Sequence, residues 1–291
     1  MGPFALNALA VLGCAAIGIA VGRRRRCVWL PVALAATALT LVRAGLRWRE
    51  DLAAVLFPWI DYPLVENWHV PACLLGLTAL VRQLPKRRTR FVVGGATGFV
   101  AAYGIWLAAA TFLVSFDDLT GAPDRSGFCR QTSSYSCGAA ALCTLLAHLD
   151  VASSERELAR LSATQWHGGA TTLGLWRAAR LKLRNRPYRV RVRRISWDDL
   201  NGGHEKVFFV SPRIWAPTTD GDNASRHPVP GILPCVVVVR YSLLVDHFVT
   251  VLGVEGSRVT VADPLAPGMG LWSREELESR WRRLALVVDP A

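Results

Sequence analysis

At 291 residues, 52% of them hydrophobic, the chain is long enough for two structural units and is unusually apolar for a soluble enzyme. Its formal net charge is +12, but no recognised nucleic-acid-binding motif accompanies the arginines, so binding to DNA or RNA is not expected. Apolar runs and arginine clusters concentrate in residues 1–116, whereas residues 117–291 have the mixed composition of a globular domain. The sequence therefore predicts a transmembrane helical region over 1–116 and a globular domain over 117–291.

Residues 1–116 contain four apolar stretches that are candidates for crossing a bilayer as helices. The stretches are Phe4–Gly22, Cys27–Leu46, Trp68–Val81 and Phe91–Phe116. The third is short, and it reaches spanning length only with the preceding segment Tyr62–Val70. A cleaved signal peptide is the alternative for residues 1–22, but no basic segment precedes that apolar run. We therefore expect about four spans.

The short loops between these stretches predict their orientation. Arg23–Arg26 separates the first two stretches, and a second basic segment, Arg82–Arg90, precedes the last. Short loops rich in arginine and lysine stay in the cytoplasm, whereas the loop from Arg43 to Glu66 has balanced charge and fits the opposite side. Both ends of the chain, and with them residues 117–291, are expected to face away from the cytoplasm.

Helical patterns come first in the globular part, after residues 117–128, which contain glycine and proline and are interpreted as a linker. Apolar periodicity and capping residues predict helices over Cys137–Leu149, from Ser154 to Leu161 and from Thr171 to Arg180. Strand patterns follow. β-Branched runs bounded by turn residues predict strands over Tyr188–Arg194, Cys235–Arg240, Val245–Val254, Arg258–Ala262 and Leu284–Val288.

Residues 201–231 are rich in Gly, Pro, Asn and Asp and are interpreted as a long loop or insertion around Val207–Val210. Ser273-Arg-Glu-Glu276 is a capping box and predicts one more short helix before the last strand. Helices come first and an antiparallel sheet follows, so the expected class is α+β.

The seven cysteines divide between the two parts of the chain. Those in or beside the apolar stretches are Cys14, Cys27 and Cys73, and those in the globular part are Cys129, Cys137, Cys143 and Cys235. Their spacing matches no zinc site, and no metal is expected. If Cys137 is a free thiol, two of the other three in the globular part could form a disulfide outside the cell, and the sequence leaves the pairing open.

Cys137 opens an apolar helix, where the positive end of the helix dipole favours the thiolate, the reactive form of cysteine. His247 would hold the proton as imidazolium and deliver it to the leaving amine. Asp263 would orient the imidazole by accepting a hydrogen bond from its other nitrogen. The Gln131 amide and the backbone N–H of Cys137 would stabilise the oxyanion.

Each of these residues has an ordinary structural explanation when it is taken alone. Cys137 could be an inert helix cysteine, His247 a surface histidine at a strand start, and Asp263 a turn former before proline. All four nevertheless occur in one order, each where a helix or strand end would place it. That combination favours a cysteine hydrolase.

Four segments carry a resemblance to a known family: Gln131-x5-Cys137-Gly138-Ala-Ala, Gly169-Ala-Thr-Thr-Leu-Gly-Leu, His247-Phe-Val-Thr-Val-Leu-Gly and Ala262-Asp263-Pro264. Through these segments, the part of the chain from about residue 125 to 291 resembles the bacteriocin-processing double-glycine leader peptidases. These enzymes are papain-like cysteine peptidases. The resemblance implies a nucleophile, a base, an orienting residue and an oxyanion donor at Cys137, His247, Asp263 and Gln131, respectively. It also implies a leader peptide cut after a Gly-Gly pair in a narrow cleft, with substrate-binding residues at Gly138, Gly169, Thr171 and Thr172.

The chain also departs from that family's usual arrangement. The peptidase domain is often fused in the cytoplasm to an export ATPase, but this sequence has no GxxxxGK[ST] loop, so ATP binding is not expected. The membrane region precedes the peptidase domain, and residues 201–231 have no obvious counterpart. Whether that segment gates the cleft stays open.

Other polar residues have weaker functional signals. The basic face over Arg180–Arg194 is interpreted as a solvated surface, with contact to anionic lipid headgroups or an acidic substrate as the alternative. His167 is a candidate for lining the cleft near Gly169. The remaining histidines of the globular part show no spacing to a partner and are interpreted as structural or surface residues; they are His148, His204 and His227.

The sequence thus predicts a multi-pass protein of a bacterial cell membrane whose extracytoplasmic domain hydrolyses a peptide or protein substrate without a cofactor. Two alternatives keep the same fold. One is a catalytically silent module that binds peptides, and the other is an acyl transferase in which an amine replaces water at the thioester.

Overall fold

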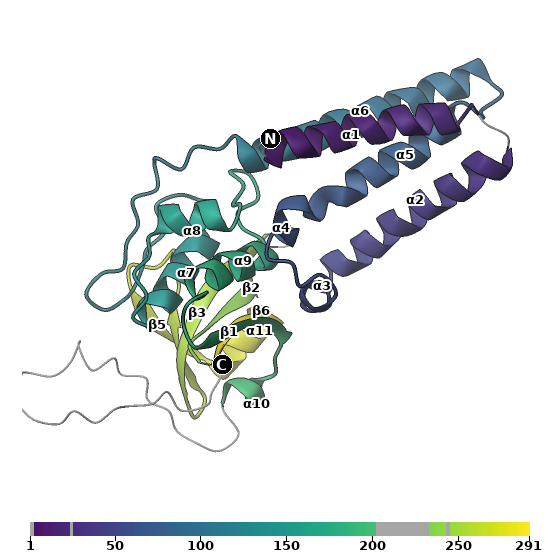
Figure 1. Ribbon diagram of the computed structural model, residues 1–291. Helices are drawn as coiled ribbons and strands as arrows, with labels where there is room; N and C mark the ends of the chain where they lie inside the picture. The colour runs from purple at the N-terminus through teal and green to yellow at the C-terminus, as the bar shows by residue number, and fades with distance from the viewer. Residues whose placement is uncertain (1–2, 24–25, 202–232, 243–244) are drawn as a thin grey trace, which may run out of the picture. The chain divides into compact units, whose positions relative to one another are not determined.

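The computed structural model describes residues 3–23, 26–201, 233–242 and 245–291 (Figure 1). Residues 1–114 and residues 115–291 form two separate units, each held together by its own contacts. Nearly all of the predicted loop or insertion at 201–231 lies outside the described residues, as do two of the histidines, His204 and His227.

The first unit is helical. Its elements are α1 (Pro3–Val21), α2 (Arg26–Arg47), α3 (Glu50–Leu56), α4 (Tyr62–Val65), the 3₁₀ turn η1 (Glu66–Trp68), α5 (His69–Val81) and α6 (Arg87–Phe112). Helix α5 packs against α1, α2 and α6, and Val11, Leu74 and Leu107 are buried together between them. The elements α4, η1 and α5 follow one another without a break, so the third apolar stretch is helical from Tyr62 onward.

The outward surface of this unit is apolar. Phe91 and Phe99 on α6, for example, are 84% and 74% exposed. Three helical stretches are long and apolar enough to cross a bilayer by length and composition: Val28–Arg47, Tyr62–Val81 and Arg87–Phe112. In α1, the apolar stretch Asn7–Val21 is shorter than a helix that could cross a bilayer. A fourth span therefore stays a prediction.

The second unit confirms the predicted α+β class. Its helices are α7 (Cys137–Ala147), α8 (Glu155–Leu161), α9 (Thr172–Lys182), α10 (Trp197–Leu200) and α11 (Arg274–Arg280). Its strands are β1 (Tyr188–Arg194), β2 (Cys235–Arg240), β3 (Asp246–Glu255), β4 (Arg258–Ala262), β5 (Met269–Ser273) and β6 (Trp281–Pro290). The strands form one antiparallel sheet in the order β1-β6-β2-β3-β4-β5.

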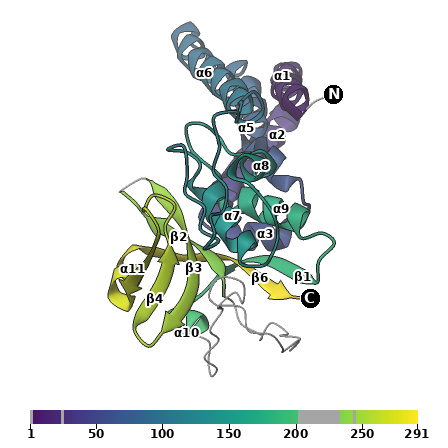
Figure 2. The same cartoon turned by 90° about the vertical axis from the view of Figure 1, so that its left-hand side faces the viewer.

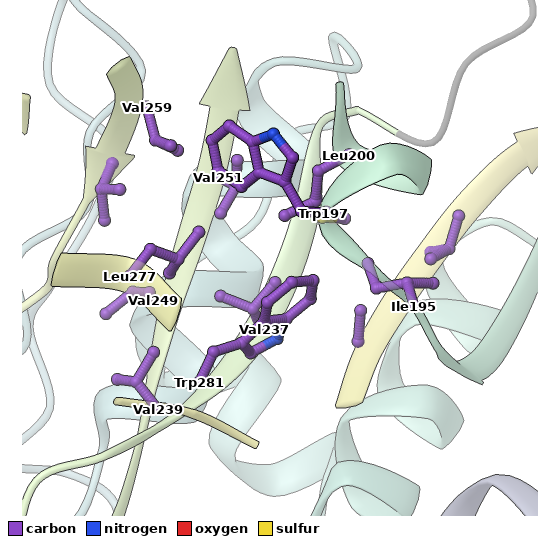
Figure 3. Packing of buried hydrophobic residues seen from close by; sticks show 14 residues of the cluster. Ile195, Trp197, Leu200, Val237, Val239, Val249, Val251, Val259, Leu277 and Trp281 are labelled. Atoms are coloured by element: carbon purple, nitrogen blue, oxygen red, sulfur yellow. The ribbon is translucent and has the colours of Figure 1, made fainter. Parts of the chain in front are cut away.

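Helices cover both faces of this sheet (Figure 2). On one face, Leu277 of α11 and Trp197 of α10 pack with alternate strand residues such as Val249 in a single apolar cluster (Figure 3). On the other face, the buried Thr250 hydroxyl of β3 donates a hydrogen bond to the carbonyl of Ala141 in α7, at 2.7 Å. This bond fixes α7 against β3, the helix and strand that carry the two principal candidate residues.

A buried carboxylate holds the segment that leads into α7. Glu155, at the start of α8, is 0% exposed, and its two oxygens accept hydrogen bonds from the backbone N–H groups of Gly121 and Thr132 at 2.9 and 2.8 Å. The backbone N–H of Glu155 also donates to the Gly121 carbonyl at 2.9 Å. Residues 121–132, interpreted from sequence in part as a loose linker, are therefore tied to α8.

Candidate active site

Cys137 is the first residue of α7, and a tight turn delivers the chain to it. Within this turn, the Ser136 hydroxyl donates to the Ser133 carbonyl at 2.8 Å and accepts from the Ser133 N–H at 3.2 Å. Cys137 is partly exposed, whereas the other cysteines of this unit, Cys129, Cys143 and Cys235, are buried. A substrate can therefore reach the sulfur of Cys137 but not the other three.

His247 and Asp263 come from neighbouring strands. His247 is the second residue of β3, and Asp263 directly follows β4, which pairs with β3 through Thr250 and Ala262. The Nε2 atom of His247 lies 2.7 Å from Oδ1 of Asp263. The same Oδ1 accepts the backbone N–H of Leu265 at 2.9 Å. The turn after β4 therefore fixes the carboxylate, and the carboxylate fixes the imidazole.

The second nitrogen of the imidazole faces the cysteine. The Cys137 thiol lies close enough to the imidazole to raise the pKa of His247. Nε2 faces Asp263, which leaves Nδ1 as the nitrogen available to the thiol. The structure thus brings Cys137, His247 and Asp263 together, and their action as a catalytic triad stays a prediction.

The charges at this site stabilise each other. Burial lowers the pKa of His247, but its hydrogen bond with Asp263 and the nearby Cys137 thiol outweigh burial and raise the pKa to about 9. Burial raises the pKa of Asp263, but the hydrogen bonds from His247 and from the Leu265 N–H outweigh it and hold the pKa below its usual range. At neutral pH the site therefore favours an imidazolium beside an aspartate anion.

Gln131 lies next to the aspartate turn and before the cysteine turn. Its backbone N–H donates to the Pro264 carbonyl at 3.1 Å, and its side-chain Nε2 donates to the Ser133 carbonyl at 2.8 Å. An amide nitrogen carries two N–H groups, so one remains to be donated to a ligand. Its Oε1 is buried and has no partner among the described residues. The structure thus places Gln131 between the loops that carry Cys137 and Asp263.

The four predicted substrate-binding residues lie in two places. Gly138 is buried, and a Cβ there would meet Ala170 and Leu175 at 3.2 Å. Gly169 has φ +70, in the left-handed region, and lies against the Tyr135 carbonyl. Both are therefore close in the fold to the turn before Cys137. Thr171 and Thr172 belong to the start of α9, where the Thr171 hydroxyl accepts from the Gly174 N–H and Thr172 is buried. Their contact with a substrate stays a prediction.

The other singled-out residues are placed at the surface or in structural roles. His167 is exposed, and its ring meets that of Trp166 edge to face. In the basic face, Arg191 forms an ion pair with Asp289 of β6 at 2.6 Å. His148 packs beside Gly127, in keeping with the structural interpretation of this histidine.

Two residues that the sequence did not single out lie at the site. Tyr241, in the hairpin between β2 and β3, is 67% exposed, and its ring centroid lies 5.9 Å from that of His247. Glu155 holds Thr132, the neighbour of Gln131. The sequence signal that could have identified Tyr241 is its position as an aromatic residue in a turn shortly before His247. No local signal distinguishes Glu155, since acidic residues are common in the first turn of helices.

Known proteins match most of the second unit, residues 115–291. The model of the peptidase C39 family matches residues 125–201 and 229–291. An uncharacterised protein of Methanothermobacter marburgensis is 34% identical over 135 residues, which cover 46% of this chain and 69% of that protein. The unmatched interval in the family model falls within the predicted insertion at 201–231.

Solved structures with a similar fold include two peptidases of transporters. The peptidase domain of Streptococcus ComA, a bifunctional ABC transporter involved in a quorum-sensing pathway, matches with 21% identity and a TM-score of 0.40, covering 56% of this chain and 96% of that one. A double-glycine-motif protease from an AMS/PCAT transporter, in complex with the leader peptide, matches with 19% identity and a TM-score of 0.40, covering 61% and 97%. Neither likeness is close enough to carry a functional conclusion.

Proposed function

Because the chain belongs to the peptidase C39 family, we propose that it is a membrane-anchored cysteine peptidase with Cys137 as nucleophile. The observation that supports this most is the buried His247, which is hydrogen-bonded to Asp263 and lies beside the Cys137 thiol. A binding protein gains nothing from a buried imidazole held between a thiol and a carboxylate, whereas covalent catalysis requires that arrangement.

In the proposed reaction, the Cys137 thiolate attacks the carbonyl carbon of the scissile peptide bond. The oxyanion accepts hydrogen bonds from the Gln131 amide and from the backbone N–H of Cys137 at the start of α7. The His247 imidazolium then protonates the leaving amine, and the C–N bond breaks to leave a thioester on Cys137. Water, deprotonated by His247, hydrolyses the thioester and releases the acid and the free thiol.

For the substrate, we propose a leader peptide that is cut after two glycines. The support is the match to the family, together with crowding around Cys137, because the turn that carries Gly169 packs against Tyr135 just before the nucleophile. Small residues fit such an approach better than branched ones. Residues 1–114 would anchor the enzyme, and the positive loops between the apolar stretches favour a catalytic domain outside the cytoplasm.

The test uses the full-length protein in detergent and synthetic peptides with a central Gly-Gly pair. We expect native protein and Ser134→Ala, a control at an exposed residue of the same turn, to cleave after the second glycine. Cys137→Ala should leave the peptide intact while keeping the native circular dichroism spectrum. Replacing either glycine of the peptide by leucine should lower kcat/KM by about 100-fold or more, which corresponds to about 2.7 kcal/mol.

The acyl-transferase alternative is separated in the same assay by running it in water enriched in ¹⁸O. Hydrolysis places ¹⁸O in the new carboxyl group, and a product joined to an amine carries none. Cleavage that is equally fast in Cys137→Ala would contradict the proposed function, and cleavage by the native protein that ignores both glycines would contradict the proposed substrate.

A further inference from the structure

Cys129 and Cys143 lie side by side in the interior of the catalytic unit. Both are free thiols in this structure and 0% exposed. The backbone N–H of Cys129 donates to the Thr144 hydroxyl at 3.0 Å, which sets Cys129 against the turn of α7 that carries Cys143. The Sγ atom of Cys129 lies 3.9 Å from the Arg130 carbonyl, and that of Cys143 lies 3.5 Å from two oxygens of Ser153. Each thiol also shifts the pKa of the other, as expected of neighbouring side chains. The segment before α7 thus brings Cys129 beside the helix turn that carries Cys143.

The other cysteines of this unit are directed elsewhere. Cys235 lies in β2 and packs in the apolar cluster with Trp197 and Leu277, on the sheet face opposite α7. Cys137 is engaged with His247. Of the three pairings that the sequence leaves open among Cys129, Cys143 and Cys235, the structure supports only one.

The buried pair has no part in the proposed hydrolysis. The neighbouring Cys143 thiol, and then burial, raise the pKa of the Cys129 thiol, so it is a poor nucleophile in the folded protein. Substrate cannot reach it either, because it is fully buried. What two adjacent thiols can do in an oxidising compartment is join to each other.

We propose that Cys129 and Cys143 form a disulfide in the mature protein, made as the chain folds outside the cytoplasm. The inference rests on the orientation proposed above. Two S–H bonds are lost and one S–S bond forms, while two protons and two electrons reduce the disulfide of a thiol–disulfide oxidoreductase or of a small-molecule disulfide to two thiols.

This bond would close a loop that contains both Gln131 and Cys137. A covalent link across such a loop limits the freedom of the unfolded chain and thereby stabilises the folded unit. The disulfide would therefore complement Glu155, which holds the same segment through Thr132. It would secure the segment that contains Gln131, the proposed oxyanion donor, to α7, which begins with Cys137.

The experiment is peptide mapping of the full-length protein without reductant. Membranes are first treated with acid and N-ethylmaleimide, so that free thiols are blocked and existing disulfides are preserved. We expect a linked peptide pair that contains Cys129 and Cys143 and disappears after reduction. Cys235→Ser, the control, should keep the linked pair, and Cys129→Ser should lose it. Reduction should lower the apparent unfolding temperature of native protein by roughly 5–10 °C and leave that of Cys129→Ser unchanged.

Recovery of Cys129 and Cys143 both alkylated, or either of them linked to Cys235, would overturn the inference. Peptide cleavage is measured on the same preparation. A protein that cleaves peptides but holds both thiols alkylated refutes the disulfide alone, and a protein with the linked pair but no cleavage refutes the proposed function alone.

Discussion

His247 is buried between a thiol and a carboxylate, and these two partners keep it protonated despite burial. Its pKa of about 9 means that the imidazolium persists through neutral pH and loses its proton only at alkaline pH. Because the imidazolium is the proposed proton donor to the leaving amine, kcat/KM should fall with a midpoint near pH 9. A pH profile of peptide cleavage by the native protein measures this midpoint.

Asp263→Asn tests the role of the carboxylate in that pKa. The Asp263 hydrogen bond is the largest of the interactions that raise the pKa of His247, so its loss should move the alkaline midpoint of kcat/KM to lower pH. We also expect kcat/KM at the optimum to fall roughly 10²- to 10⁴-fold, the range that general acid–base catalysis contributes. An unchanged alkaline midpoint would show that Asp263 does not govern the imidazole.

Gln131→Ala tests the proposed oxyanion donor. Removing one such donor typically costs about 10²–10³ in kcat, and KM should change little because the bond strengthens only in the transition state. The control is Thr132→Ser, which keeps the hydroxyl and the N–H that Glu155 holds. A Gln131→Ala variant with native kcat would remove Gln131 from the mechanism.

Among the elements, α8 has an influence on the site that its sequence does not reveal. Glu155→Gln replaces one carboxylate oxygen with an NH₂ group, so either the Gly121 or the Thr132 N–H faces a donor and loses its acceptor. A buried, unsatisfied donor costs about 1–3 kcal/mol, and we expect a matching loss of unfolding free energy together with a lower kcat. Thermal unfolding and peptide kinetics measure the two effects.

Glu157→Gln is the matched control on the same helix. Glu157 is 45% exposed and pairs with Lys182 at 2.9 Å, and such surface ion pairs are worth about 0–1 kcal/mol. If Glu155→Gln were as mild as Glu157→Gln, the buried carboxylate would not be what holds the segment before α7.

The elements divide into those with a sequence signal and those without. Helices α7 to α9 and the strands of the sheet centre follow from apolar runs and caps, and Ser154 and Ser273 cap their helices as predicted. Strand β5, Met269–Ser273, lacks β-branched residues and is placed by pairing with β4. The four-residue α10 depends on a local capping box at Ser196. Periodicity encodes neither element, since β5 depends on a tertiary pairing and α10 is too short to show a helical repeat.

The site shows the same division. Cys137, His247 and Asp263 stand at element ends, so their convergence could be predicted once the strand order was guessed. The roles of Tyr241 and Glu155 could not be predicted, because they depend on which segments meet in space. The proximity of Cys129 to α7, on which the proposed disulfide rests, likewise could not be predicted from the sequence.

At the scale of the whole molecule, the account predicts which surfaces face the cytoplasm. In a Cys137→Ser background, a membrane-impermeant maleimide should label Glu275→Cys, on the exposed surface of α11, in intact cells. It should label Lys86→Cys, in the basic loop before α6, only after the cells are made permeable. The reverse pattern would place the catalytic unit in the cytoplasm.

The central claim is that Cys137 becomes covalently acylated during peptide cleavage. Full-length protein is mixed with a Gly-Gly peptide, quenched in acid within milliseconds to seconds, and digested for mass spectrometry. The account predicts that the peptide containing Cys137 gains the acyl portion of the substrate as a thioester, and that the adduct decays on longer incubation. Cleavage at the native rate by Cys137→Ala, or an adduct on any residue other than Cys137, would contradict it.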